Sequence, residues 1–354
     1  MQTQLTMLPP PDEMYDAVVR RDPGYDGIFL TAVASTGIFC RPSCSAKKPL
    51  RENVEFFATA RDAMFAGYRA CRRCRPLEPA GTAPPWLRSL LDDVAATPAE
   101  PWSDAHLKAR GMDPARVRRW FKSQYGMTFQ AYRRGLRLGH ALGQLREGAS
   151  VTSAAFDSGY DSLSGFSEAL QQLVGRAPSA SRDATPVVLT RLLTPLGPMI
   201  AGATDDGLCL LEFSDRRMLE EQLRRIARLL PGPLTPGRHP LLDQTEDELR
   251  RYFARELREF TVPLAAPGSA FQRRVWDGLR RIPYGETRSY AQQAAAIGRP
   301  DAVRAVARAN GDNRIAIVIP CHRVVGSDGQ LTGYGGGLWR KRWLLNLEAD
   351  TASR

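Results

Sequence analysis

Two proline-rich segments divide this sequence and limit what it can fold into. They occupy residues 75–85 and 177–186. Segments rich in proline and small residues are typical of linkers between domains, and 354 residues are too many for one compact core. The sequence therefore predicts three domains, at residues 1–78, 85–180 and 187–350.

The chain is strongly basic. Lysine and arginine outnumber aspartate and glutamate by 49 to 38, which gives a formal net charge of +11 and a pI near 9.7. A basic excess favours a polyanionic partner, most often nucleic acid. A solvated basic surface without any partner explains the charge equally well, so the choice between these two interpretations depends on the motifs.

The composition gives no sign of membrane targeting. The first ten residues lack the basic and apolar stretches of a signal peptide, and no apolar run reaches the roughly 18 residues of a transmembrane helix. We therefore expect a cytoplasmic monomer without a membrane partner. Its six cysteines should stay reduced, so metal binding or catalysis explains them better than disulfides.

Four of the cysteines form two short pairs near the N-terminus. Cys40 and Cys44 are separated by three residues, and Cys71 and Cys74 by two. Two close pairs at this range suit one tetrahedral Zn²⁺ held by four thiolates. The spacing alone favours a purely structural zinc site. It does not distinguish the four sulfur atoms, which are chemically equivalent at this level.

The middle segment carries the pattern of two helix-turn-helix units. Asp113 and Pro114 are typical of the N-cap and first position of a helix, and Val117, Trp120 and Phe121 follow at helical spacing. The basic residues of this helix fall largely off its apolar face: Arg116, Arg118, Arg119 and Lys122. Such a helix can enter a DNA major groove.

A long amphipathic helix is expected next, over residues 128–147. A helix of about 20 residues spans about 30 Å, which is close to one turn of DNA. The second unit would place its recognition helix at residues 162–173, which contain no lysine or arginine. We expect fewer phosphate contacts there. A helical bundle that merely links two enzymes is the alternative.

The C-terminal segment begins with a predicted β-hairpin and ends with helices. Apolar stretches flank the turn Asp205-Asp206-Gly207 between residues 196 and 213, and Cys209 within them is expected to be an inert buried thiol. After residue 267 the pattern becomes helical. Ser289 and Pro300 are expected to begin two helices of another helix-turn-helix.

Cys321 stands out within Ile319-Pro320-Cys321-His322-Arg323-Val324. The bland interpretation is a buried thiol after an apolar run. A cysteine followed directly by His-Arg on a proline turn is unusual for pure packing, and a neighbouring imidazole is what activates a thiol nucleophile.

The flanks of the N-terminal cysteines resemble the zinc domain of the Ada family of adaptive-response regulators and repair methyltransferases. The similarity rests on residues 36–44, 50–54 and 71–76, with Ala70 where relatives are expected to have proline. It implies that zinc-bound Cys40 accepts the methyl group of a DNA methylphosphotriester. Methylation would make the cluster less negative and so strengthen promoter binding.

The middle segment resembles the AraC-type DNA-binding domain, and residues 193–348 resemble the O6-methylguanine-DNA methyltransferases. The second resemblance implies that Cys321 takes the alkyl group irreversibly from O6-methylguanine, and also from O4-methylthymine. His322 would be the general base, acting directly or through water, and Glu348 would orient it. By the same resemblance, Arg304 would fill the gap that the flipped base leaves in the DNA stack, and Tyr290 would help rotate the DNA backbone and protonate the leaving guanine. Asn313 would fix the active-site turn, and Tyr334 would line the base pocket.

Together these motifs predict a multidomain α+β protein. It would combine a small zinc-binding α/β domain, an all-α double helix-turn-helix domain, and an alkyltransferase domain of one α/β and one helical part. Its partners would be alkylated and promoter double-stranded DNA and RNA polymerase. The alternative is a transcription factor with a purely structural zinc site and a vestigial repair domain, and a repair enzyme without a regulatory role is a further rival.

Overall fold

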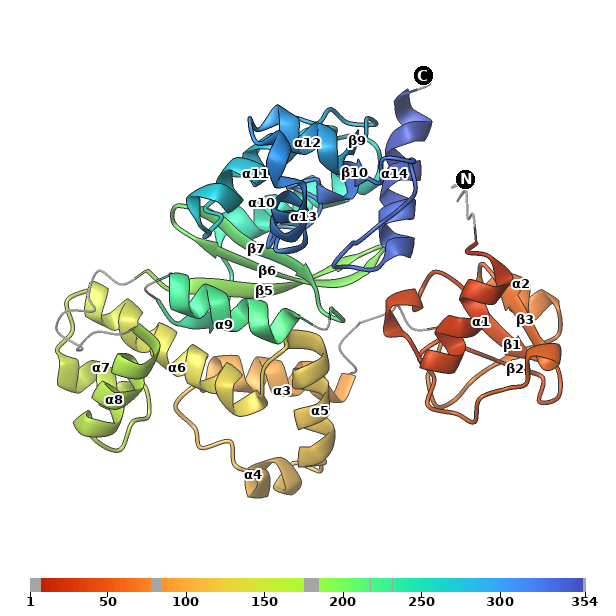
Figure 1. The fold of residues 1–354 in the computed structure, drawn as a ribbon. Coiled ribbons are helices and arrows are strands. Elements are labelled where there is room, and N and C mark those ends of the chain that lie inside the picture. Colours follow the sequence, from red (N-terminus) through yellow and green to blue (C-terminus); the bar gives the residue numbers. More distant parts are fainter. Residues whose placement is uncertain (1–7, 78–84, 175–184, 217, 231, 353–354) are drawn as a thin grey trace. The chain divides into compact units, whose positions relative to one another are not determined.

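A computed structural model describes residues 8–77, 85–174, 185–216, 218–230 and 232–352 (Figure 1). Two compact units make up the chain: residues up to Thr82 with Leu193–Pro198, and residues Ala83–Leu192 with Met199–Arg354. Most of both predicted linkers lies outside the described residues. Among the described helices, none has the length and apolar character that crossing a membrane requires.

The first unit is a small α/β domain built on a four-stranded sheet of order β3-β1-β2-β4. β1 pairs antiparallel with β2 and β3, whereas β4 runs parallel to β2. Its core includes Leu30, Phe39 and Ala63. The elements are α1 (Pro11–Arg20), η1 (Pro23–Tyr25), β1 (Leu30–Val33), β2 (Ile38–Cys40), η2 (Arg51–Asn53), β3 (Val54–Phe57), α2 (Ala60–Phe65) and β4 (Arg69–Ala70).

The middle segment is all helical, as predicted. Side chains of Ser103, Asp113, Thr128 and Ser150 accept hydrogen bonds from backbone N–H groups of the first turns of α4 to α7, which is why these helices begin there. The predicted long helix is α6. The helices are α3 (Pro85–Ala96), α4 (Asp104–Ala109), α5 (Pro114–Tyr125), α6 (Phe129–Arg146), α7 (Val151–Asp157) and α8 (Leu163–Val174).

The C-terminal segment begins with a sheet of order β7-β6-β5-β8. The predicted hairpin is confirmed as the antiparallel pair β6 and β7, and Cys209 is fully buried in it. The elements of this half are β5 (Val187–Thr194), β6 (Gly197–Thr204), β7 (Gly207–Phe213), α9 (Leu219–Leu229), β8 (Leu234–Pro236) and α10 (Pro240–Phe253).

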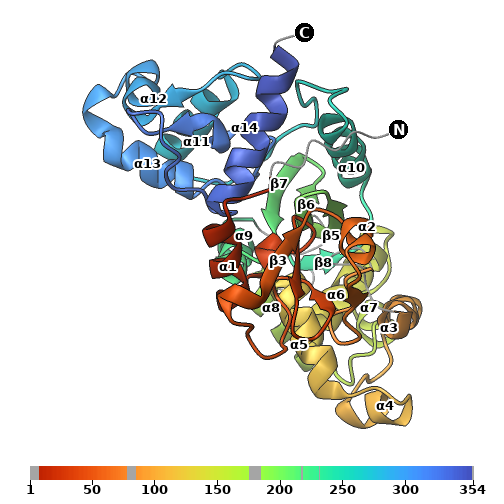
Figure 2. The ribbon, with the colours of Figure 1, turned by 90° about the vertical axis from the view of Figure 1, so that its right-hand side faces the viewer.

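The other half is helical, and α11, α12 and α13 gather beside α14 in both views (Figures 1 and 2). Ser269 and Ser289 form capping boxes with Gln272 and Gln292. The helix expected from Pro300 begins with a 3₁₀ turn. The elements are α11 (Ala270–Arg280), β9 (Arg288–Ser289), α12 (Tyr290–Ala296), η4 (Pro300–Ala302), α13 (Val303–Gly311), η5 (Cys321–Arg323), β10 (Val324–Val325) and α14 (Leu338–Ala352).

Candidate functional sites: a cysteine cluster and a buried thiol

The four N-terminal cysteines converge in the first unit. Their sulfur atoms all lie within 4.8 Å of one another. Sulfur atoms around a tetrahedral Zn²⁺ lie about 3.8 Å apart, because each zinc–sulfur bond is about 2.3 Å long. The donor set therefore fits one zinc ion held by Cys40, Cys44, Cys71 and Cys74.

Strand pairing brings the two cysteine pairs together. Cys40 ends β2, and Cys71 follows β4, which runs parallel to β2. The backbone N–H of Cys71 donates to the carbonyl of Phe39 over 3.0 Å. The backbone N–H of Arg41 donates to the Cys74 sulfur over 3.3 Å. Residues 31 positions apart in the chain thus meet at one end of the sheet.

The electrostatics of the cluster call for a cation. Contacts with the thiols of Cys44 and Cys74 raise the pKa of Cys40, since several thiolates cannot share one small space without a positive charge. A bound metal ion reverses this effect and keeps coordinating sulfur deprotonated. The surrounding surface is basic, with exposed Lys47, Lys48, Arg72 and Arg73.

The first helix-turn-helix presents its basic side chains to solvent. Arg116 and Arg119 are exposed on α5, while Val117 and Phe121 are fully buried. The Arg116 guanidinium lies 4.5 Å from the centre of the Trp86 ring. Arg119 is within 3.8 Å of the Asp113 carboxylate. Both arginines therefore point away from the domain core.

Cys321 lies at the start of η5, and only 7% of it is exposed. The side-chain amide of Asn313 donates to the Cys321 sulfur over 3.1 Å and to the Ile319 carbonyl over 2.9 Å. The Asn313 amide oxygen accepts from the backbone N–H of Ile315 over 3.0 Å. Ile317 has a φ of 72°, a conformation that β-branched residues rarely adopt. Asn313 thus spans a tight, strained turn that presents the sulfur.

Glu348 organises the groups behind the thiol. Its carboxylate accepts from His322 Nε2 over 2.9 Å and from Arg323 over 2.8 and 2.9 Å. It also accepts from the Tyr252 hydroxyl over 2.7 Å and from the Gly285 backbone N–H over 3.2 Å. His322 and Glu348 are fully buried. The carboxylate is therefore fixed from four directions, and it fixes the imidazole in turn.

Burial and hydrogen bonding determine the protonation states. Burial raises the pKa of Cys321, although the Asn313 amide opposes the shift. Burial lowers the pKa of His322 against the pull of Glu348. Burial would also raise the pKa of Glu348, but hydrogen bonds and charge from His322 and Arg323 prevail and lower it. The resting arrangement is a neutral thiol, a neutral imidazole and an ionised carboxylate.

The three other predicted residues of this site lie on two helices and a loop. Arg304 is exposed on α13. Tyr290 begins α12, and its hydroxyl donates to the Thr332 carbonyl over 3.5 Å. Tyr334 is half-buried, and within the described residues its buried hydroxyl has no hydrogen-bond partner. Burial raises the pKa of Tyr334 well above its usual range, and the charge of Cys321 adds to the increase.

Sequence reasoning missed three buried residues at this site. Tyr252 belongs to α10, 96 positions from its partner Glu348. Arg323 was visible in the motif, but its pairing with Glu348 was not anticipated. Lys341 on α14 donates to the carbonyls of Val324 and Thr332 over 2.5 and 2.7 Å, and burial lowers its pKa to about 8.

Comparisons with known proteins agree with all three segments. Residues 13–77 match the family described as the metal binding domain of Ada, and residues 107–184 match a helix-turn-helix domain. Residues 270–350 match the DNA binding domain of 6-O-methylguanine DNA methyltransferase.

Similar proteins extend the match along the chain. The bifunctional transcriptional activator/DNA repair enzyme Ada of Escherichia coli is 36% identical over 354 residues, covering 97% of this chain and 98% of that protein. A methylated-DNA–protein-cysteine methyltransferase of Methanosarcina acetivorans is 41% identical over 157 residues, covering 44% of this chain and 95% of that protein. The methylated-DNA–protein-cysteine methyltransferase of Mycobacterium bovis is 60% identical over 106 residues, covering 30% of this chain and 64% of that protein.

These findings confirm the predicted fold class, the zinc site of four cysteines and the bifunctional interpretation. A regulator with a vestigial repair domain is disfavoured, since the similarity to an activator that is also a repair enzyme runs through nearly the whole chain. The chain belongs to the Ada family, whose members combine a zinc-binding domain and transcriptional activation with DNA repair by methyl transfer to cysteine.

Proposed function

We propose that Cys321 accepts the methyl group of O6-methylguanine in DNA, and that of O4-methylthymine as well. The observation that carries this proposal is a set of two contacts. The Asn313 side-chain amide donates to the Cys321 sulfur, and Glu348 holds the imidazole of His322, the next residue in the chain. Each of these groups is buried, so bulk solvent does not compete for these contacts.

Proton transfer prepares the sulfur for attack. His322 is held by Glu348 through Nε2, and within the described residues Nδ1 has no hydrogen-bond partner. Because no hydrogen bond is found between the imidazole and the Cys321 sulfur in the described part of the chain, we assign the proton transfer to a bridging water rather than to direct contact. The ionised Glu348 then stabilises the imidazolium that forms.

The methyl transfer itself is a displacement at carbon. The Cys321 sulfur forms a bond to the methyl carbon, the bond from that carbon to O6 breaks, and its electron pair stays with the guanine. Tyr290 supplies the proton that the leaving guanine takes up. The product is a thioether, a very poor leaving group, so each Cys321 reacts once.

The target base must leave the DNA stack to reach a thiol this deeply buried. Arg304, exposed on α13, would fill the gap in the stack. The ring of Tyr334 would line the pocket that receives the base.

We further propose that Cys40 accepts a methyl group from a methylphosphotriester. A bound zinc ion, held by all four cysteines, would keep the sulfurs deprotonated. The Cys40 sulfur bonds to the methyl carbon, and the departing electron pair restores a phosphate diester. A cluster of four thiolates carries a net charge of about −2, and methylation reduces its repulsion of phosphate. Promoter DNA would then bind more tightly.

The remaining roles follow from the helix-turn-helix and the overall family pattern. Arg116 and Arg119 are exposed on α5 and would contact promoter DNA in the major groove. We propose RNA polymerase as the partner at the promoter, a monomeric state, and the cytoplasm as the location. The domain boundaries proposed are residues 1–78, 85–180 and 187–350.

Peptide mapping tests the two acceptor assignments together. Zinc-loaded protein is incubated with duplexes that carry either O6-methylguanine or a methylphosphotriester, digested, and analysed by mass spectrometry. We expect methyl groups on Cys321 from the first duplex and on Cys40 from the second. Unmodified Cys321 would overturn base repair. Modified Cys321 with unmodified Cys40 would reduce the zinc site to a structural one.

A further inference from the structure

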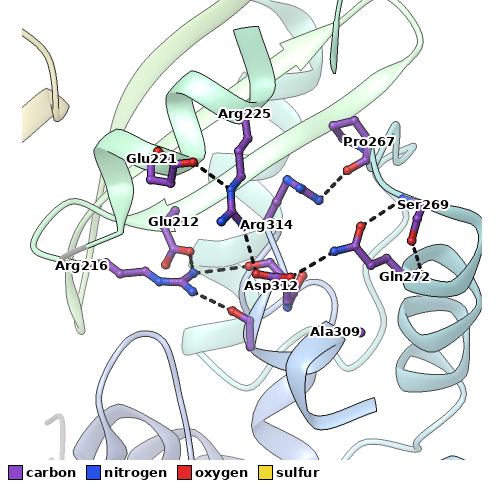
Figure 3. Close-up of polar contacts among 12 residues, drawn as sticks. Glu212, Arg216, Glu221, Arg225, Pro267, Ser269, Gln272, Ala309, Asp312 and Arg314 are labelled. Atoms are coloured by element: carbon purple, nitrogen blue, oxygen red, sulfur yellow. Dashed lines mark hydrogen bonds and ion pairs between the residues drawn. The ribbon is translucent and has the colours of Figure 1, made fainter. Parts of the chain in front are cut away.

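Arg216 extends from the turn after β7 to the backbone that follows the helix α13 (Figure 3). Its guanidinium donates to the Gly311 carbonyl over 2.8 Å and to the Asn313 carbonyl over 3.4 Å. It also pairs with the carboxylate of Glu212 on β7. One side chain from the sheet half therefore holds the segment that supplies Asn313 to the active-site turn.

This ion pair is almost fully removed from water. The side chain of Glu212 is 1% exposed and that of Arg216 is 10% exposed. Burying two charges carries a large desolvation cost, so such a pair is weak support for stability. Its position close to the reacting thiol suggests a role in the reaction.

The pocket loop lies directly on the guanidinium. A Cβ atom added to Gly335 would lie 2.6 Å from Arg216 Cζ, and one added to Gly336 would lie 2.7 Å from the Phe213 ring. At either distance a neighbouring group would have to shift to admit a side chain. Glycine at position 335 thus lets the loop that carries Tyr334 lie against the Arg216 guanidinium, and glycine at position 336 lets it lie against Phe213.

Other contacts fix the same turn independently of Arg216. Arg225 and Gln272 each bind the Asp312 carboxylate over 3.1 Å (Figure 3). The backbone of Leu211 on β7 bonds to Arg314 and Ala316, each over 2.7 Å. Loss of Arg216 should therefore leave the turn folded and release the carbonyls of Gly311 and Asn313.

We propose that Arg216 is a positioning residue for methyl transfer, which holds Asn313 in contact with the Cys321 sulfur while its partner Glu212 balances the charge beside that sulfur. The proposal rests on the assignment of Cys321 as the acceptor. It assigns the buried pair of Glu212 and Arg216 a function at the Cys321 sulfur. Through this pair, the sheet half of the domain contributes to methyl transfer.

The charges around the thiol support this role. Burial is the main cause of the raised pKa of Cys321. The Glu212 carboxylate adds to the increase, whereas Arg216 and Lys341 oppose it. Among the described residues, the charged and titratable side chains that act on the sulfur include Glu212, Arg216, Lys341 and Tyr334, with His322 next to it in the chain. Removing Arg216 should thus raise the pKa of Cys321, and removing Glu212 should lower it.

Three single variants of the full zinc-loaded chain test the proposal: Arg216→Met, Glu212→Gln and the control Arg228→Met, which alters an exposed arginine on α9. The measurement is the single-turnover rate of Cys321 methylation by an O6-methylguanine duplex as a function of pH. For Arg216→Met we expect a profile moved to higher pH by about one unit and a plateau lowered about tenfold. For Glu212→Gln we expect movement to lower pH, and for the control no movement.

A second measurement separates this proposal from the acceptor assignment. The variants are treated with iodoacetamide without DNA, and labelling of the Cys321 peptide is followed against pH. The same opposite shifts are expected, whether or not DNA is repaired. An Arg216→Met profile that coincides with those of the unmodified chain and of Arg228→Met would overturn the positioning role. Should Arg216→Met fail to fold, Glu212→Gln decides by the direction of its shift: movement to higher pH, or none, would contradict the proposal.

Discussion

The Asn313 side-chain amide lies 3.1 Å from the Cys321 sulfur, although eight positions separate the two residues. The contact exists because the same amide also bonds to Ile319 and Ile315 within the turn. The position of the nucleophile is thus fixed by a side chain that itself has no freedom to move.

Replacing Asn313 with alanine should disturb both stability and reaction. The backbone groups of Ile315 and Ile319 would lose buried hydrogen bonds, each costing about 1–3 kcal/mol. The turn would relax, and the single-turnover rate of Cys321 methylation should fall at least about tenfold. Urea denaturation and rapid-quench kinetics measure the two effects. The exposed Asn346→Ala on α14 is the control, and equal losses in both variants would contradict this role.

Acidification should slow methyl transfer at Cys321. His322 is neutral at rest because burial lowers its pKa below the ordinary value of about 6.5. Protonation removes the base, so the rate should drop only as the pH falls below about 6.5. At alkaline pH the rate should rise, because the pKa of Cys321 is raised. Single-turnover rates between acid and alkaline pH check this, and a rate that increases on acidification would contradict it.

Glu348→Gln should destabilise the protein in a pH-dependent way. Removing the charge leaves Arg323 buried without its carboxylate, which costs about 3–5 kcal/mol. The pKa of Glu348 is lowered in the folded chain. Its contribution is therefore complete above the unfolded value of about 4.3 and is lost as the pH falls through the lower folded value.

Urea denaturation at several pH values measures that prediction. The free-energy difference between the unmodified chain and Glu348→Gln should be full near neutral pH and shrink in acid. Glu246→Gln alters an exposed carboxylate on α10 and should show a small difference throughout. A difference in unfolding free energy that grows in acid would contradict the proposed role of the buried ion pair between Glu348 and Arg323.

Removing zinc should separate the two activities. Without a cation the clustered sulfurs repel one another once ionised, so chelation should unfold the first unit and abolish transfer from methylphosphotriesters. Cys321 lies in the other unit and should still react with O6-methylguanine. Duplexes with each lesion, assayed before and after chelation and after zinc is restored, provide the measurement. Loss of both activities with equal dependence on zinc would refute the separation.

Local signals predicted much of this molecule. The cysteine spacing predicted the zinc ligands, and the capping residues Asp113 and Ser289 predicted where helices begin, because both depend on neighbours along the chain. Tyr252 and Arg216 escaped prediction. Their partners lie 96 and 97 positions away, and no periodicity or spacing encodes contacts that only the packed domain creates.

The most direct test of the central claim counts methyl groups. Zinc-loaded protein is mixed with a large excess of duplex containing O6-methylguanine, and methyl transfer is followed to completion in the unmodified chain, Cys321→Ala and Cys40→Ala. The account predicts a plateau of about one methyl per chain, unchanged in Cys40→Ala and absent in Cys321→Ala. Continued turnover, or a plateau that survives in Cys321→Ala, would contradict it.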